Sequence, residues 1–331
     1  PGDSQILNNL GLCLQHLGDA DGAADRFAQA LHHVPDDVRI QTNHASALKT
    51  AGRHENALAA FRGAAETNPG FQPAQLGLAR LLRDLGRDAE ARATLERISA
   101  ARGDGTFRAT CASWRLPVIA ASLDEMRARR AEYEAAVGAL HSVTAQIAED
   151  DLTSAGTNFQ AVYQGVDDRS CQEAIADYYL RNCPSLGHEA PHLGEAPRGA
   201  IRLGFVSANF RNHTVGKLFR GLIAKMDRRR FRVEVFATDQ PRDEIGRFIA
   251  GNCDAFTVLP GNLAQARETI ARTRPHILFY ADIGMDAFTY FLAFSRLANV
   301  QCVGWGHGVT TGIESMDLFI SHTHLEDARS E

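Results

Sequence analysis

The chain has 331 residues, enough for two domains at the usual size of roughly 100–200 residues per domain. Hydrophobic residues make up 44% of it and charged residues 23%, a globular balance that excludes a disordered or collagen-like chain. The net charge is −5 and the arginines are spread along the chain, so we expect no nucleic-acid partner. No apolar run reaches about 18 residues, so we expect no membrane span.

Cysteine usage and the first residues bear on the cellular compartment. The cysteines lie far apart, with no C-x-x-C pair, at Cys13, Cys111, Cys171, Cys183, Cys253 and Cys302. This spacing is typical of reduced thiols rather than of a disulfide frame or a zinc site. The chain also begins without the basic and apolar segments of a secretory signal. We therefore expect a cytoplasmic protein without a metal.

A 34-residue period runs through the first third of the chain. It links prolines, glycines, leucines and alanines, at Pro1, Pro35 and Pro69; Gly18, Gly52 and Gly86; Leu14, Leu48 and Leu82; and Ala23, Ala57 and Ala91. Each unit predicts a helix, a turn at the glycine, and a second helix that ends at the proline. This is the tetratricopeptide repeat pattern, in three copies over residues 1–103.

Such helix pairs stack into a superhelix whose concave surface binds peptides or protein segments. Asn9 and Asn43 occupy the same column of the first helix in two successive repeats, and Gly77 takes that column in the third. A carboxamide can hydrogen-bond a peptide backbone without reading its side chains, so we take both asparagines as candidate peptide-binding residues. The alternative is that asparagine merely suits this column.

Residues 104–197 predict a helical connector, with helices at Met126–Ile147 and Asp168–Arg181. The stretch Cys183–Gly199 contains three prolines and three glycines, which is typical of a linker. The chemistry of this segment is not visible in its sequence.

From residue 198 to residue 331 apolar strands alternate with helices. The predicted strands are Ile201–Ser207, Phe231–Thr238, Ala255–Leu259, His276–Tyr280, Gln301–Gly304 and Leu318–Ser321. The predicted helices are Val215–Met226, Asp243–Ala250, Ala264–Arg272 and Ala287–Leu297. This pattern predicts a Rossmann-like lobe, a parallel sheet covered on both faces, with ligands bound outside the carboxyl ends of its strands.

The segments after three of these strands contain the candidate site residues. His213, after the first strand, is a potential proton acceptor at the start of a helix, and Asp282 follows the fourth strand. Gly306, His307, Thr310 and Thr311 follow the fifth, in a loop with four glycines and two threonines within nine residues. Neither G-x-G-x-x-G nor a Walker lysine motif is present.

Each candidate also has a purely structural interpretation. His213 could hydrogen-bond the local backbone at a helix entry, and the glycines and threonines could serve only the turn. Asp286 is as suitable for a helix cap as for a ligand. His276 precedes its strand and is expected to be structural. His322 and His324 make a weak metal pair, because no further ligands stand at suitable spacing.

Taken together, these segments resemble the O-GlcNAc transferase family. The matching stretches are RLGFVSANFRNHTVGKL (202–218), RFRVEVFATD (230–239), residues 275–321 with GWGHGVTTG, and more weakly residues 163–186. They look most similar to the bacterial SPINDLY-like branch linked to tetratricopeptide repeats, with kinship to bacterial protein N-glucosyltransferases. The resemblance implies a two-lobed GT-B fold, of which residues 198–331 are the N-lobe. The C-lobe, which holds most of the UDP-sugar, is absent from this chain.

The resemblance implies inverting transfer of a sugar, GlcNAc first, from a UDP-sugar to Ser or Thr of a protein acceptor bound by the repeats, without a metal or other cofactor. His213 aligns with the family's proposed general base or sugar-contacting histidine. Gly306, His307, Thr310 and Thr311 match a loop that faces donor or acceptor, and Asp282 could orient a histidine. With one lobe only, we expect little or no turnover from residues 1–331 alone.

Two other functions remain open at this point. The chain could be a non-catalytic tetratricopeptide scaffold with a degenerate lobe, since Gly308, Asn299 and Ala281 stand where relatives often have proline. It could also be an asparagine glucosyltransferase, which shares the fold and the GH-x-x-TT loop.

Overall fold

The computed structural model describes residues 2–102, 116–117, 119–152 and 157–325. Two compact units divide these residues, with the division between residues 130 and 131. The domain boundary predicted at residue 103 and Cys111 lie outside the described residues. Among the helices that the structure describes, none is long and apolar enough to cross a membrane.

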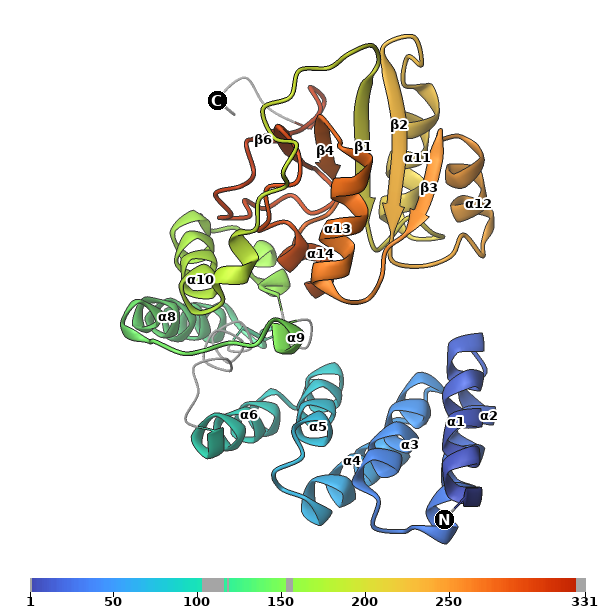
Figure 1. Cartoon of the computed structure of the whole chain (residues 1–331). Coiled ribbons are helices and arrows are strands. Elements are labelled where there is room, and N and C mark those ends of the chain that lie inside the picture. Colours follow the sequence, from blue (N-terminus) through green and yellow to red (C-terminus); the bar gives the residue numbers. More distant parts are fainter. Residues whose placement is uncertain (1, 103–115, 118, 153–156, 326–331) are drawn as a thin grey trace. The chain divides into compact units, whose positions relative to one another are not determined.

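The described part of the first unit contains three helix pairs, coloured blue to teal in Figure 1. They are α1 (Gly2–Leu17) with α2 (Ala20–His33), α3 (Val38–Thr50) with α4 (His54–Thr67), and α5 (Gln72–Asp84) with α6 (Asp88–Arg102). The turn glycines Gly18, Gly52 and Gly86 adopt φ of +86°, +75° and +71°, a region that favours glycine. Each helix packs against the next one along the chain. Three helix pairs thus lie where the 34-residue period predicted them.

Close packing explains why the third repeat has a glycine in the asparagine column. The Phe61 ring is buried between the second and third pairs. A Cβ on Gly77 would overlap this ring, so a side chain at position 77 would displace a core aromatic group. Gly77 therefore serves the packing of α4 against α5.

The outer face of α1 differs from the matching faces of the later repeats. Ile6, Leu10 and Leu17 are 66%, 44% and 77% exposed. One repeat later, Ile40 is buried, and two repeats later Leu78 is buried, because α2 packs on α3 and α4 on α5. Helix α1 has no such preceding helix among the described residues and leaves an apolar stripe open.

The second unit begins with short helices. They are the end of α8 (Leu123–Gly138), η1 (Ala139–Ser142), α9 (Glu149–Leu152), η2 (Phe159–Gln164), α10 (Arg169–Asn182) and η3 (Pro184–Gly187). Helix α10 matches its prediction within a residue. The prediction of a helix as far as Ile147 is wrong beyond Gly138, because α8 ends at this glycine, a residue type that forms helices poorly. There the chain turns to lie along α10, with the Ile147 N–H donating to the Asn182 carbonyl at 2.9 Å.

Six parallel strands follow, in the order β3-β2-β1-β4-β5-β6. They are β1 (Ile201–Ser207), β2 (Phe231–Ala237), β3 (Ala255–Val258), β4 (Ile277–Tyr280), β5 (Val300–Gly304) and β6 (Leu318–Ile320). All six were predicted, with ends that differ by at most one residue. This is the strand order of the doubly wound dinucleotide-binding folds.

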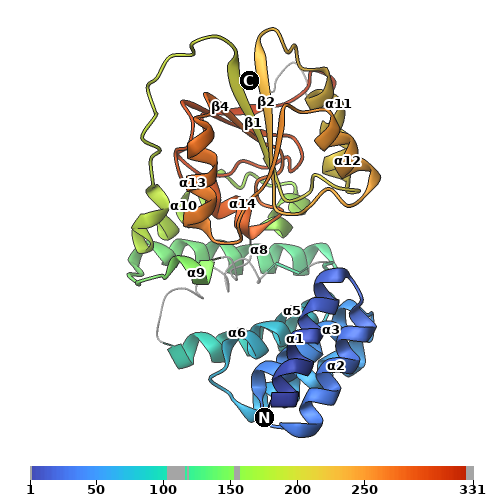
Figure 2. The same ribbon diagram turned by 45° about the vertical axis from the view of Figure 1, so that its right-hand side comes forward.

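Helices cover both faces of this sheet. They are α11 (Thr214–Lys225), α12 (Glu244–Gly251), α13 (Leu263–Thr273) and α14 (Ala287–Leu292). Figures 1 and 2 show α11 and α12 on one face and α13 and α14 on the other. A core of apolar residues from β1, β2 and the flanking helices lies between sheet and helices.

Helix α14 ends five residues earlier than predicted. The backbone groups of the residues that would continue it form hydrogen bonds with other segments instead. The Arg296 N–H donates to the His188 carbonyl at 2.8 Å, and the Arg296 carbonyl accepts from the Ala190 N–H at 2.9 Å. The Leu297 N–H donates to the Gln301 side chain at 2.8 Å. The same bonds show that part of the predicted linker is packed against the lobe rather than free.

Candidate functional site

The sheet grows outward in opposite directions from β1 and β4, which are neighbours. In an open parallel sheet, the crevice outside the carboxyl ends of such a strand pair is the usual ligand site. Strand β1 ends at Ser207, β4 at Tyr280, and β5, beside β4, at Gly304. The loops after these three strands contain every site residue predicted for the lobe.

Asp282 is buried at this point, with 1% of its surface exposed. Its Oδ2 accepts a hydrogen bond from Asn209 Nδ2 at 2.6 Å, and the Asn209 N–H donates to Ser207 Oγ at 2.8 Å. Burial raises the pKa of Asp282 above its ordinary value, although the bonds from Asn209 and Ser207 and the charge of His213 oppose that rise. A carboxyl group that resists ionisation thus ties the β4 loop to the β1 loop.

His213 caps α11. Its Nδ1 accepts a hydrogen bond from the Val215 N–H at 3.3 Å. Because Nδ1 is the acceptor, the neutral ring carries its proton on Nε2. Nε2 can then donate to a ligand, and it can accept a proton only after the ring exchanges tautomer and the bond to Val215 breaks. The structure thus shows the helix-entry bond, and the role as a base stays a prediction.

The glycine-threonine loop after β5 is joined to the β4 loop. The Gly306 N–H donates to the Ala281 carbonyl at 3.0 Å, and a Cβ at position 306 would overlap that carbonyl. Since Asp282 follows Ala281 and bonds to Asn209, the loops of β1, β4 and β5 form one connected edge. From the sequence, His213 and this loop were expected to line one cavity at the same end of the sheet. They lie at the same end, but His213 is not among the residues that line the cavity beside Thr310 and Thr311.

His307 is wedged between two other segments. Its ring stacks on Phe159 from η2, with centroids 5.1 Å apart and planes 15° apart. A Cβ on Gly284 would approach His307 Cδ2 to 2.7 Å, so the Cδ2 edge of the ring lies close against the β4 loop. Its side chain is only 8% exposed, and burial lowers the pKa of His307. A neutral, closely packed imidazole joins the connector to the lobe.

A cavity of about 710 Å³ lies between this loop and β6. Thr310 and Thr311 line it, together with Trp305 and Phe319. Thr310 is exposed, whereas Thr311 is buried and its Oγ1 accepts from the Ile313 N–H at 3.2 Å. Thr310 is thus the threonine whose hydroxyl is open to a ligand.

Two other candidates have local roles. His276 Nδ1 accepts from the Arg202 N–H at 3.0 Å, at the amino end of β4, and Asp286 Oδ1 accepts from the Thr289 N–H at 2.9 Å and caps α14. The rings of His322 and His324 lie 4.9 Å apart. Across the described ranges, no group of three or more metal-binding side chains gathers.

The two asparagines predicted to bind peptide have different surroundings. Asn43 Nδ2 donates to Asn8 Oδ1 at 3.1 Å, which links α3 to α1. Asn9 is exposed, and its Oδ1 accepts from Gln5 Nε2 at 2.9 Å on the same helix. Both carboxamides are engaged, and only that of Asn9 lies open at the surface.

Known proteins resemble the repeats in sequence and the whole chain in structure. Residues 48–112 match a family model described as tetratricopeptide repeat, and no curated protein matches the chain in sequence. A solved structure, a point mutant of the Thermobaculum terrenum O-GlcNAc transferase, is 20% identical with a TM-score of 0.67, over 98% of this chain and 54% of that one. The TPR2B domain of yeast Sti1, solved with an Hsp70 peptide, is 19% identical with a TM-score of 0.31, over 41% of this chain and 98% of that one.

The chain has the fold of the N-terminal part of an O-GlcNAc transferase. It spans about half the length of that transferase, 54% of its chain. The predicted fold class, helical repeats and a helical connector followed by a parallel-sheet lobe, is confirmed by this likeness and by the strand order.

Two residues of the candidate site were not predicted from sequence. Asn209 holds Asp282, and its position two residues after a strand was a usable signal. Phe159 stacks on His307. It belongs to an aromatic-rich stretch of the connector, but nothing in that stretch indicates which ring it contacts.

Proposed function

We propose that this chain is part of a protein glycosyltransferase. In this proposal it transfers a sugar, GlcNAc first, from a UDP-sugar to a Ser or Thr hydroxyl, and its repeats bind the acceptor polypeptide, with Asn9 as the open carboxamide. The supporting observation is the joint likeness of both units, in this order, to an O-GlcNAc transferase over 98% of the chain. The described cysteines are free, which suits a reducing compartment such as the cytoplasm.

The geometry favours His213 over His307 as the imidazole that meets the reactants. In inverting transfer the acceptor oxygen attacks the anomeric carbon, the bond from that carbon to the UDP oxygen breaks, and the hydroxyl proton passes to a base. His213 lies half-buried at the rim with Nε2 uncommitted. It donates to the sugar in the tautomer with the proton on Nε2 and accepts the proton in the other. The proposal requires no metal or other cofactor.

The test is a transfer assay with the full-length natural protein. It is incubated with UDP-GlcNAc, UDP-glucose or GDP-fucose and a serine-rich acceptor protein, and intact-mass spectrometry detects an added sugar. We expect transfer from UDP-GlcNAc and a loss of roughly 10²–10⁴ in rate for His213→Ala, with His324→Ala, an exposed histidine, as control. The proposal fails if no donor yields product and calorimetry shows no heat of binding for any of them.

A second candidate function is a non-catalytic docking scaffold, which two side-chain contacts support. His307 is buried by stacking and His213 is committed to a cap at Nδ1, so neither imidazole is poised as a free base. A scaffold binds acceptor polypeptides through its repeats without binding any nucleotide sugar. A third candidate function is sugar transfer to asparagine. Tandem mass spectrometry distinguishes it by identifying the modified residue in the acceptor.

A further inference from the structure

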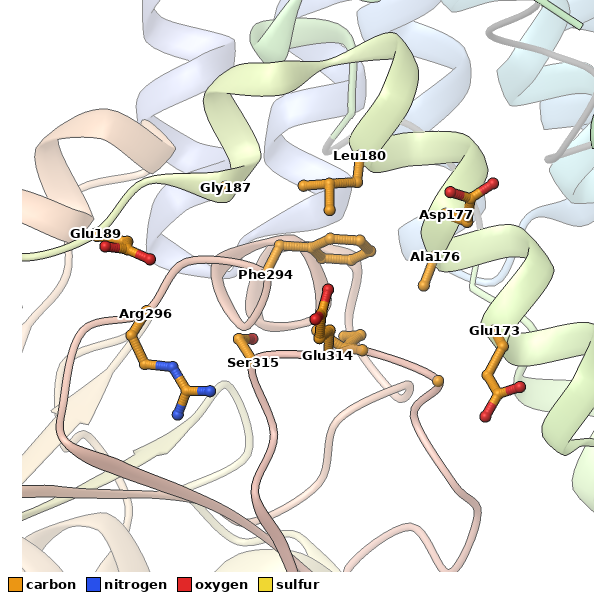
Figure 3. A pocket seen from close by; sticks show the side chains of 12 residues that line it. Glu173, Ala176, Asp177, Leu180, Gly187, Glu189, Phe294, Arg296, Glu314 and Ser315 are labelled. Carbon is orange, nitrogen blue, oxygen red and sulfur yellow. The ribbon is translucent and has the colours of Figure 1, made fainter.

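A second cavity, of about 480 Å³, lies between α10, η3 and residues 312–315 (Figure 3). Its wall is apolar, made by Ala176, Leu180, Phe294 and Ile313. In Figure 3 the Phe294 ring lies in the middle of this wall, below Leu180. An apolar wall of this kind suits carbon atoms of a ligand rather than a hydrated ion.

Carboxylates surround that wall. Glu173 and Asp177 come from α10, Glu189 follows η3, and Glu314 follows the glycine-threonine loop. Figure 3 shows Glu189 on one side of Phe294, Glu173 and Asp177 on the other, and the Glu314 carboxylate pointing up between them. The cavity therefore combines a carbon-rich wall with a negatively charged rim.

The ion pairs leave that rim with uncompensated negative charge. Arg296 is the cation among the lining residues, and its Nη1 lies 2.6 Å from Asp317 Oδ2, which neutralises it. Glu173 and Asp177 pair with arginines on the exposed side of α10. Among the described residues, neither Glu189 nor Glu314 has a cationic partner within ion-pair distance.

The cavity is built by backbone contacts. Gly312 has φ of +67° and lies so close to the Gln172 carbonyl that a Cβ would overlap it, which holds the 312–315 segment against α10. Ser315 Oγ donates to the Ala293 carbonyl, and the Glu189 segment is joined to Arg296 by a β-bridge. Three segments distant in sequence are thus fixed around one space.

We propose that this cavity binds a lysine or arginine side chain of the acceptor polypeptide. The aliphatic stem lies along Phe294 and Leu180, and the cationic head reaches Glu189 and Glu314. Lysine and arginine carry such a stem and head, and a cation near an aromatic face gains further attraction. A metal ion alone would leave the apolar wall unused.

The position of the cavity indicates which polypeptide binds there. Gly312 and Ile313 line it, and they directly follow Thr310 and Thr311, which line the other cavity. Successive Cα atoms are about 3.8 Å apart, so the two cavities are a few residues from each other along one loop. This step rests on the proposed function, and it predicts acceptors with a basic residue close to the modified hydroxyl.

Binding is tested apart from transfer, by NMR titration of the ¹⁵N-labelled chain. The probe is a serine-containing pentapeptide with one lysine, and the matched peptide carries Nζ-acetyl-lysine. We expect the lysine peptide to shift the amide signals of Gly312 and Glu314 and to bind several-fold more tightly than the acetylated one, with an advantage that falls at high salt.

Variants then locate the site. Glu189→Gln with Glu314→Gln should remove the preference for lysine, whereas Glu244→Gln, an exposed glutamate on α12, should keep it. Equal affinity for both peptides, or a preference that survives the double variant, overturns the proposal. So does Ca²⁺ binding that depends on the two glutamates without any peptide preference. A lysine preference in a protein that transfers no sugar contradicts the transferase and leaves the cavity's ligand class standing.

Discussion

The repeat unit and the α/β unit bury their polar groups in different ways. In the repeats the buried threonine hydroxyls bond within their own helix, as Thr42 Oγ1 does to the Val38 carbonyl at 2.7 Å, and the bond from Asn43 to Asn8 reaches only to the neighbouring repeat. In the α/β unit buried polar groups bond across long sequence distances. Asp282 bonds to Asn209, and Arg267 bonds to Glu149, 118 residues away, at 2.7 Å.

This difference shows where each unit can tolerate change. Each repeat packs on the repeat next to it, so a repeat can vary while the array keeps its form. The connected edge formed by the loops of β1, β4 and β5 depends on a few polar side chains from distant segments. Removing one of them leaves its buried hydrogen-bond partner unsatisfied. The variants below test that contrast, from the largest expected effect to the smallest.

Phe61→Ala should break the repeat unit. It removes a fully buried ring between two helix pairs, and such truncations cost about 3–5 kcal/mol of unfolding free energy. Calorimetry should show one transition shifted to lower temperature and the other unchanged. Phe248→Ala, at a half-exposed ring on α12, is the control. Equal shifts of both transitions would mean that the two units unfold together.

Gly312→Ala should break the anchor between the loop and α10. The new Cβ meets the Gln172 backbone at a positive φ, so we expect a loss of more than about 1 kcal/mol in unfolding free energy. Gly308→Ala is the matched control in the same loop, where nothing lies within 4 Å of the Cβ. It should be neutral or stabilise by about 0.4–1 kcal/mol. Chemical denaturation measures both, and the opposite order would contradict this account.

His307→Phe should make the α/β unit less sensitive to acid. Burial lowers the pKa of His307 below its ordinary 6.5, so on acidification the unfolded chain takes up the proton first. The stabilisation is present above pH 6.5 and is lost as the pH falls through the lower folded value. Phenylalanine keeps the stack on Phe159 without titrating. Denaturation at pH 8 and pH 5 should show a smaller drop for the variant, and identical drops would refute the assignment.

Asp282→Asn should reduce the loss of stability that the α/β unit shows as the pH rises. Burial raises the pKa of Asp282 above its ordinary 3.8, so the folded chain holds this proton more tightly than the unfolded chain does. The stabilisation from protonated Asp282 is complete below pH 3.8. It is lost as the pH rises through the pKa that Asp282 has in the folded chain. An asparagine oxygen can still accept from Asn209. Between pH 4 and 7 the variant's stability should decline less than the wild type's, and parallel curves would rule out this role.

Much of the fold follows from patterns that are local in sequence. The 34-residue step and the turn glycines identify the repeats, and apolar runs locate all six strands. The prediction failed where distant backbone groups compete for hydrogen bonds. Residues after Leu292 leave the helix because His188 and Ala190 bond to Arg296, and no local pattern contains that information.

The candidate site was partly predictable for the same reason. Strand ends identified His213, Asp282 and the glycine-threonine loop as residues of one edge, because parallel strands share an orientation. Their contacts depend on tertiary neighbours. The Val215 N–H fixes the tautomer of His213, and Phe159 buries His307 from a segment about 150 residues earlier.

The exposed apolar stripe on α1, formed by Ile6, Leu10 and Leu17, affects how the repeat unit unfolds. Stability in a stacked array is close to a sum over adjacent interfaces, and α1 contributes its apolar residues to one interface instead of two. In a protein that consists of residues 1–331, thermal fluctuation should therefore unfold the array from this helix inward. Amide protons of α1 should exchange with deuterated solvent fastest, and those of α4, which has a partner on each side, should be retained longest.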